Sequence, residues 1–235
     1  MKKTICRNFG AGIFISIAIA AMSQDHRIEA GASGSPAPDF SSLEPLAMAN
    51  REVAVYRVRA ATLVRHQYSK PVAIVWTKET AVTEQKDGEA STTRKISVGQ
   101  IDVYPSGTIH SLRAIKGSLH FTLVELKHNL RDPKEITSKP AACEIAVDFP
   151  QGGFACLIRI APDQEITIPE LDVNSFLIAI DSGTVRETVP RNHWEAHYRE
   201  GEPSFLPGYE QHAMQNLEHR PLQFVLIVPP PAEYK

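Results

Sequence analysis

The sequence predicts an all-β protein made of two copies of one module of roughly 100 residues. Short apolar runs alternate with turn residues such as Lys86-Asp-Gly88 along the chain, and no run keeps a helical apolar period beyond two turns. The chain also repeats itself, because four identical pairs are 102 residues apart: Arg57/Arg159, Gly99/Gly201, Pro105/Pro207 and His110/His212. A spacing this long indicates a duplicated domain rather than a solenoid unit.

The expected strands follow the same repeat. In the first copy they cover 53–58, 72–76, 95–98, 101–104 and 119–126; in the second they cover 144–147, 155–160, 176–180, 204–206 and 222–228. One inserted residue then changes the spacing to 103, which aligns Leu119, Phe121 and Leu123 with Leu222, Phe224 and Leu226. A polar connector separates the copies, so we expect one domain over 46–132 and a second over 141–231.

Composition narrows the class of protein. The 235 residues include Lys+Arg 25 and Asp+Glu 27, and no basic run or stripe is present, so nucleic acid is not expected as a partner. The hydrophobic fraction of 43% is sufficient for a packed core.

The first residues have the pattern of a secretory signal peptide. Lys2, Lys3 and Arg7 precede an uncharged apolar run, and small residues at Ala18-x-Ala20 or Ala21-x-Ser23 have cleavage spacing. We therefore expect a signal peptide over 1–23, a flexible Ala/Gly/Ser/Pro-rich tether over 24–45, and a periplasmic or secreted protein with no integral membrane span after cleavage. An uncleaved anchor is the alternative interpretation.

Two cysteines remain after the expected cleavage. Cys143 and Cys156 flank a turn, and they would face each other across two strands if that turn centred on Phe149-Pro150. Export makes a disulfide chemically possible. The sequence leaves open whether they are paired or are two buried free thiols.

One motif connects the repeat to a known family. Gly99-x5-Pro105-x-Gly107-x2-His110 resembles the second signature of the cupin superfamily, G-x5-P-x-G-x2-H-x3-N, with Ala114 in place of the final Asn. The glycine permits a positive φ and the proline sets a rigid turn before the strand that carries the histidine.

The second copy keeps much of the same signature. Gly201, Pro207, His212 and Asn216 have the required spacing, although the inner glycine, Gly208, falls one place early. The resemblance implies two tandem antiparallel β-barrels of the cupin, jelly-roll type. It also implies a divalent metal, such as Mn, Fe or Zn, held by three His and one Glu, of which the first signature, G-x5-H-x-H-x3-4-E-x6-G, supplies two His and the Glu.

The first copy departs from that first signature. His66 stands where its first His belongs, Tyr68 replaces the second, and no Glu follows at the required spacing. His66 and His110 are thus the metal candidates of this copy, with Tyr68 as a further pocket residue. Two His are a poor donor set for Zn or Fe, so the alternative is a pocket lined by polar residues.

The second copy has no His in the matching stretch. Glu170 and Asp172 take both His positions if a two-residue gap is allowed, and with His212 they would form an oxygen-rich site suited to Mn or Mg. The alternative is a pair of solvated acids on a loop. His193, Glu195 and His197 would share one face of a strand, which we interpret as exposed.

These observations favour an exported bicupin of unassigned activity that has lost most metal ligands and binds a small molecule or serves a structural role. The alternative is a metal-dependent cupin enzyme, of isomerase or dioxygenase type, with a reduced site in one barrel. A monomer and a homodimer are both compatible with the sequence.

Overall fold

A computed structural model of the chain describes residues 48–49, 53–127, 139–150 and 152–230. These residues form antiparallel strands and turns and contain no helix, which confirms the all-β prediction. It follows that the described part of the chain has no helix long and apolar enough to span a membrane. The expected signal peptide and tether lie outside the described residues.

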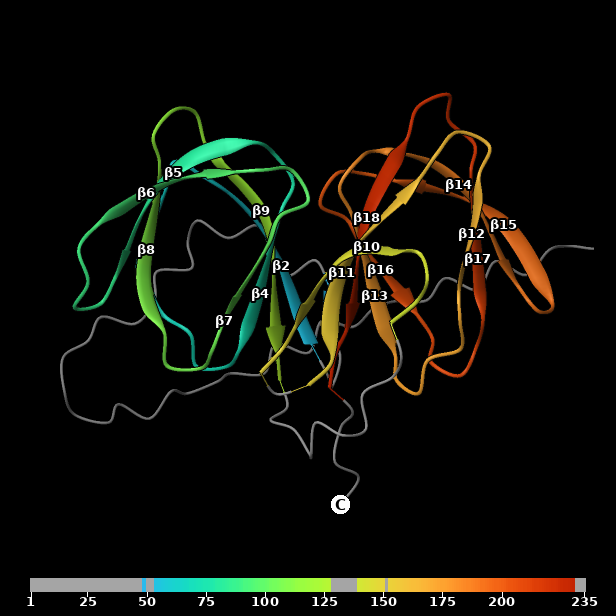
Figure 1. Cartoon of the computed structure of the whole chain (residues 1–235), viewed down its shortest axis with the longest axis horizontal. Helices are drawn as coiled ribbons and strands as arrows, with labels where there is room; N and C mark the ends of the chain where they lie inside the picture. The colour runs from blue at the N-terminus through green and yellow to red at the C-terminus, as the bar shows by residue number, and fades with distance from the viewer. Residues whose placement is uncertain (1–47, 50–52, 128–138, 151, 231–235) are drawn as a thin grey trace, which may run out of the picture. The chain divides into compact units, whose positions relative to one another are not determined.

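Eighteen strands are described, and they fall into two sets of nine (Figure 1). The first module consists of β1 (Met48–Ala49), β2 (Val53–Ala60), β3 (Thr62–Gln67), β4 (Val72–Trp76), β5 (Thr80–Lys86), β6 (Thr92–Ile96), β7 (Ile101–Tyr104), β8 (Ile109–Ala114) and β9 (Leu119–Leu126). The second module consists of β10 (Cys143–Asp148), β11 (Phe154–Ile160), β12 (Glu165–Ile168), β13 (Ser175–Ala179), β14 (Gly183–Val189), β15 (Asn192–Tyr198), β16 (Pro203–Leu206), β17 (His212–Asn216) and β18 (Leu222–Val228).

The strand order of the second module repeats that of the first. The first module has a five-stranded sheet, β1-β2-β9-β4-β7, and a four-stranded sheet, β3-β8-β5-β6. Adding nine to each strand number gives the two sheets of the second module, β10-β11-β18-β13-β16 and β12-β17-β14-β15. No described sheet mixes strands of the two modules. This matching topology agrees with the repeat found in the sequence.

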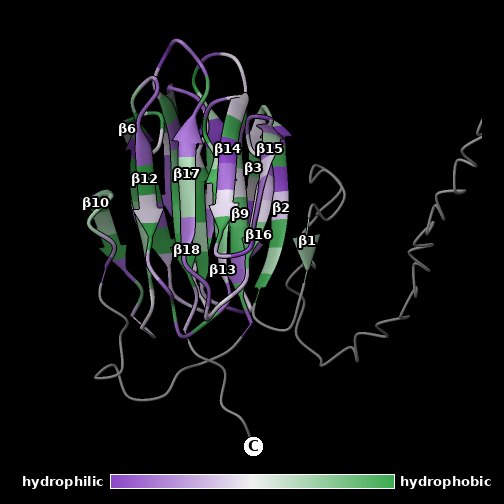
Figure 2. Ribbon diagram, turned by 90° about the vertical axis from the view of Figure 1, so that its right-hand side faces the viewer, coloured by the Kyte–Doolittle hydropathy of each residue, from purple (hydrophilic) through white to green (hydrophobic). Residues whose placement is uncertain are grey.

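Each module has its own apolar core between its two sheets. In the first module, Trp76 and Phe121 of the five-stranded sheet pack with Val82 and Leu112 of the four-stranded sheet. The four-stranded sheets bury one face only, so polar and apolar residues alternate along their strands, as the hydrophilic bands on β14 and β17 illustrate (Figure 2).

The five-stranded sheets are buried on both faces. Along β9, Phe121 and Leu123 face the core of the first module, whereas Val124 and Leu126 belong to a third core. This third core also contains Phe176 and other residues of the second module, so it joins the two modules. Burial on both faces explains the continuous apolar runs of β4 and β18.

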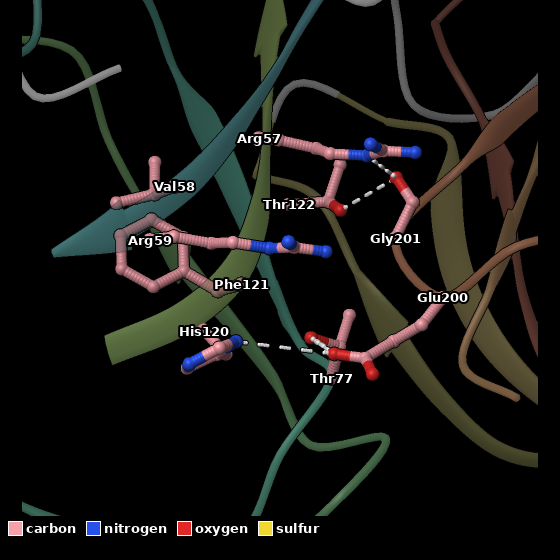
Figure 3. A pocket seen from close by; sticks show the side chains of 9 residues that line it. All are labelled: Arg57, Val58, Arg59, Thr77, His120, Phe121, Thr122, Glu200 and Gly201. Carbon is pink, nitrogen blue, oxygen red and sulfur yellow. Dashed lines mark hydrogen bonds and ion pairs between the residues drawn. The ribbon is translucent and has the colours of Figure 1, made fainter. Parts of the chain in front are cut away.

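A polar seam borders this joint core (Figure 3). Glu200, which follows β15, accepts a hydrogen bond of 3.0 Å from Thr77 Oγ1 of the first module. The Glu200 carboxylate also lies 4.0 Å from His120 Nδ1 and 3.8 Å from Lys78 Nζ. The seam therefore adds a hydrogen bond and charged contacts to the apolar core that joins the two modules.

The next residue, Gly201, completes the seam. Its carbonyl accepts hydrogen bonds from Arg57 Nε at 3.3 Å and Thr122 Oγ1 at 3.1 Å. Its φ is +74°, and a Cβ there would lie 3.3 Å from Thr122 Oγ1, so glycine suits both the turn and the close approach. Arg57 thus contacts the backbone of the other module.

We expect the seam to contribute modestly to stability. Glu200→Gln and Thr77→Val should each lower the free energy of unfolding by about 1 kcal/mol or less, because the Glu200 carboxylate is partly exposed and a single hydrogen bond to it contributes little net stability. Urea denaturation of both single variants and the double variant should give a coupling energy of about 0.5 kcal/mol. Additive effects would contradict a direct contact, and Glu165→Gln, an exposed carboxylate on β12, is the control.

Cys143 and Cys156 form a disulfide, with their Cα atoms 5.5 Å apart. They are not directly opposite each other, contrary to the simple hairpin expected from the sequence. Cys143 pairs with Ile158 and Ala146 pairs with Cys156, and an irregularity in the register follows Cys143. The disulfide therefore crosses the β10–β11 pair diagonally.

Candidate functional site

The first module contains a buried group of polar side chains that we call the polar cluster. Antiparallel pairing of β3 with β8 places His66 directly opposite His110, with Tyr68 just beyond the end of β3. The cluster also includes side chains from β4, β5, β6 and β7, and its members are His66, Tyr68, Trp76, Glu84, Arg94, Asp102, Tyr104 and His110.

The structure brings together the three residues that the sequence singled out in this module. His110 Nε2 lies 3.0 Å from His66 Nε2 and 2.9 Å from Tyr68 Oη. The exposed fractions are 1% for His110, 6% for His66 and 5% for Tyr68. Three polar atoms thus converge on one point inside the module.

Sequence reasoning missed Glu84, the residue that orients His110. Glu84 Oε1 lies 3.1 Å from His110 Nδ1 and accepts a hydrogen bond of 2.9 Å from the Tyr104 hydroxyl, while Oε2 accepts one of 3.1 Å from Arg94 Nε. Burial alone would raise the pKa of Glu84. Hydrogen bonds from His110 and Tyr104 and the charge of Arg94 outweigh burial and lower the pKa to about 2.

When the His110 ring is neutral, the ionised Glu84 determines which of its two nitrogens carries the proton. A carboxylate only accepts hydrogen bonds, so His110 Nδ1 must carry the proton that is shared with Glu84. The lone pair of Nε2 then points toward His66 and Tyr68. An acidic partner that sets the histidine tautomer is typical of functional imidazoles.

A second layer holds Glu84 and Arg94 in place. Arg94 donates to Asp102 through Nη1 at 3.0 Å and Nη2 at 2.6 Å, and Asp102 also accepts a bond of 2.7 Å from Trp76 Nε1.

Burial, together with the charges of Glu84 and Asp102, raises the pKa of Tyr68 far above its ordinary value, so this phenol stays protonated.

No equivalent cluster is found among the residues of the second module that the structure describes. Ile168 replaces His66 as the cross-strand partner of the histidine, here His212. His212 is 4% exposed, and its ring nitrogens have no hydrogen-bond partner among the described residues. Glu187 stands 103 residues after Glu84 and is its counterpart in the second module. It accepts a hydrogen bond of 2.5 Å from the Tyr198 hydroxyl and none from His212.

The predicted oxygen-rich site is not assembled in this structure. Glu170 and Asp172 are exposed, and neither forms a hydrogen bond with the buried His212. Pro169, between Ile168 and Glu170, lies outside β12, so these acids follow the strand instead of continuing along it. Within the described ranges, no group of three or more His, Cys, Asp or Glu side chains is arranged to hold a metal.

The remaining candidates are surface features. His193, Glu195 and His197 are exposed on β15, where His197 contacts Thr184 and Glu195 lies 3.5 Å from Arg186. Arg159 of β11 lies 3.8 Å from Glu144 of the edge strand β10, and both side chains are about half exposed. These contacts support the interpretation of a solvated strand face.

The polar cluster does not fit the metal centre that the resemblance implies. That centre needs three His and one Glu, whereas only His66 Nε2, His110 Nε2 and Tyr68 Oη converge here. The oxygens of Glu84 are occupied by His110, Tyr104 and Arg94. A protonated phenol is a weak metal ligand, and the three atoms lie at hydrogen-bond distances from one another.

Comparison with known proteins identifies the fold. No family model matches the chain, and no curated protein matches it. Oxalate decarboxylase of Bacillus subtilis, a protein with Mn(II) centres, superposes with a TM-score of 0.54 at 16% identity, covering 79% of this chain and 71% of that chain. AerE from Microcystis aeruginosa gives a TM-score of 0.55 at 10% identity, covering 75% and 86%. At such identities the likeness establishes the fold alone.

Proposed function

Because the chain shares the fold of these cupin proteins, we propose that it is an exported cupin-fold protein that binds a small molecule at the polar cluster of the first module. The observation that carries this proposal is the orientation of His110. The ionised Glu84 holds its Nδ1, so Nε2 is an acceptor beside His66 and Tyr68. A buried acceptor held by a charged partner is typical of a binding centre.

The difference between the modules supports this assignment. In the second module, Ser204 and Leu206 stand 102 residues after Asp102 and Tyr104, and Ala196 has the register position of Arg94. The polar network has thus been replaced by small or apolar side chains. We infer that the second module has a mainly structural role.

The disulfide supports the export part of the proposal. Cys143 and Cys156 are paired, and such pairs persist mainly in oxidising compartments. The apolar segment near the N-terminus adds to this argument, since it has the composition of a signal peptide. Periplasmic or extracellular fractionation of the tagged full chain in a bacterial host is the direct measurement.

Metal content is the decisive test of the binding proposal. Elemental analysis of the natively purified full chain should give well under one divalent metal ion per chain, because the polar cluster contains only two imidazole side chains among the described residues. Near-stoichiometric metal that is lost in both His66→Gln and His110→Gln, but kept in His212→Gln, would overturn it.

That outcome would support the second candidate, a metal-dependent cupin enzyme with a reduced site. The observation that favours it is the pairing of His110 Nδ1 with Glu84, because metal-binding histidines often have a carboxylate behind them. His66, His110 and Tyr68 would then hold the metal, which would polarise a bound oxygen or carbonyl.

A further inference from the structure

We propose that the polar cluster selects small neutral or positively charged molecules that donate a hydrogen bond, such as alcohols and amines, and excludes small carboxylates. The inference deepens the proposed function and rests on it. It follows from which atoms of the cluster can accept a hydrogen bond, and from the sum of the buried charges.

The first step concerns hydrogen bonding. Because His110 donates from Nδ1 to Glu84, its Nε2 offers a lone pair. The donors that lie within reach of this lone pair are the Tyr68 hydroxyl at 2.9 Å and His66 Nε2 at 3.0 Å. A ligand that replaces either contact must itself bring an O–H or N–H group.

The second step concerns charge. Two carboxylates, Glu84 and Asp102, face one guanidinium, so the cluster has a formal charge of −1 when its histidines are neutral. Arg94 cannot readily receive an anion, since its Nε donates to Glu84 and its Nη atoms donate to Asp102 and Tyr104. A carboxylate ligand would add a like charge to a poorly solvated site.

The third step concerns the aromatic rings. Tyr68 and Tyr104 have ring centroids 5.8 Å apart, and the Tyr104 and His110 centroids are 4.5 Å apart. The faces of phenol rings attract cations and repel anions. The two phenol rings therefore add to the preference of the cluster for neutral or positively charged ligands.

Three probes of similar size and different charge test the proposal: ethanolamine, ethylene glycol and oxalate. Each is titrated into the ¹⁵N-histidine-labelled full chain at constant ionic strength, with the His110 ring signals assigned by loss in His110→Gln. We expect ethanolamine and ethylene glycol to shift these signals, and oxalate to bind at least about tenfold more weakly than ethanolamine. The His212→Gln variant should behave like the unchanged chain.

Asp102→Asn provides the matched test of the charge argument. It removes one negative charge and weakens the hold on Arg94, so oxalate affinity should rise by about tenfold and ethanolamine affinity should fall. Asp102→Glu, which keeps the charge, should retain the original order of affinities. Circular dichroism confirms that both variants are folded.

Two results would overturn the inference: oxalate binding at least as tightly as ethanolamine in the unchanged chain, or no probe shifting the His110 signals in either protein. Both are independent of the metal measurement. A metal-poor protein that prefers oxalate would therefore refute the selectivity and leave the proposed binding function intact.

Discussion

Replacing Arg94 with Met should lower the free energy of unfolding by about 3 kcal/mol at pH 7. Arg94 is the cation between Glu84 and Asp102, whose side chains are 8% and 16% exposed. Without it, two carboxylates remain close together in a poorly solvated place, and Tyr104 loses a hydrogen-bond donor. Urea denaturation followed by circular dichroism measures the change.

A second arginine provides the control for this experiment. Arg65 forms an ion pair of 2.9 Å with Asp87, but both side chains are more than half exposed. Arg65→Met should therefore change the free energy of unfolding by less than about 1 kcal/mol. Equal losses in the two variants would show that burial of the Arg94 network has no particular effect on stability.

The same variant should alter the pH dependence of stability. The pKa of Glu84 is lowered from 4.5 to about 2 in the folded chain, so its stabilising effect is complete above pH 4.5 and is lost as the pH falls toward 2. In Arg94→Met the folded pKa is less depressed, so less stability is lost over this window. The two stability curves should converge on acidification, and parallel curves would contradict this assignment.

Loss of the disulfide should have a comparable effect. The bond joins cysteines 13 residues apart, and closing a loop of this size contributes about 3 kcal/mol in the unfolded-chain entropy account. The thermal midpoint should fall by several degrees when reductant is added to the intact chain.

The Cys143→Ala/Cys156→Ala double variant completes that experiment. It should unfold at a lower temperature than the oxidised chain and should not respond to reductant. Cys156 is fully buried, so the variant also loses some packing and should be slightly less stable than the reduced chain. A thermal midpoint that reductant leaves unchanged in the intact chain would contradict the pairing.

The strands most visible in the sequence are those buried on both faces. β4 is a continuous apolar run and β9, β11 and β18 are mostly apolar, because their sheets pack on two cores. The strands of the four-stranded sheets are harder to find. β5 and β14 alternate buried and exposed residues and are rich in Thr, Glu and Arg or Lys, so each resembles a polar loop when it is read alone.

The site was only partly predictable for a related reason. His66, Tyr68 and His110 fall at positions of the two cupin signatures. In contrast, strand pairing that no local pattern encodes brings Glu84 to His110 and Arg94 to Glu84. One signal was available, since Glu84 and Glu187 occupy the same place in the two copies at the 103-residue spacing. The exposed positions of Glu170 and Asp172 depend on where β12 ends, which sequence spacing alone does not reveal.

The joint core has a consequence for how such a molecule can diverge. In a homodimer, each substitution appears on both sides of the symmetry axis, so the two cavities must stay alike. Here both halves of the interface belong to one polypeptide, and each half accumulates its own substitutions. One copy can therefore keep buried charges in its interior while the other becomes an apolar scaffold that compensates for their cost in stability.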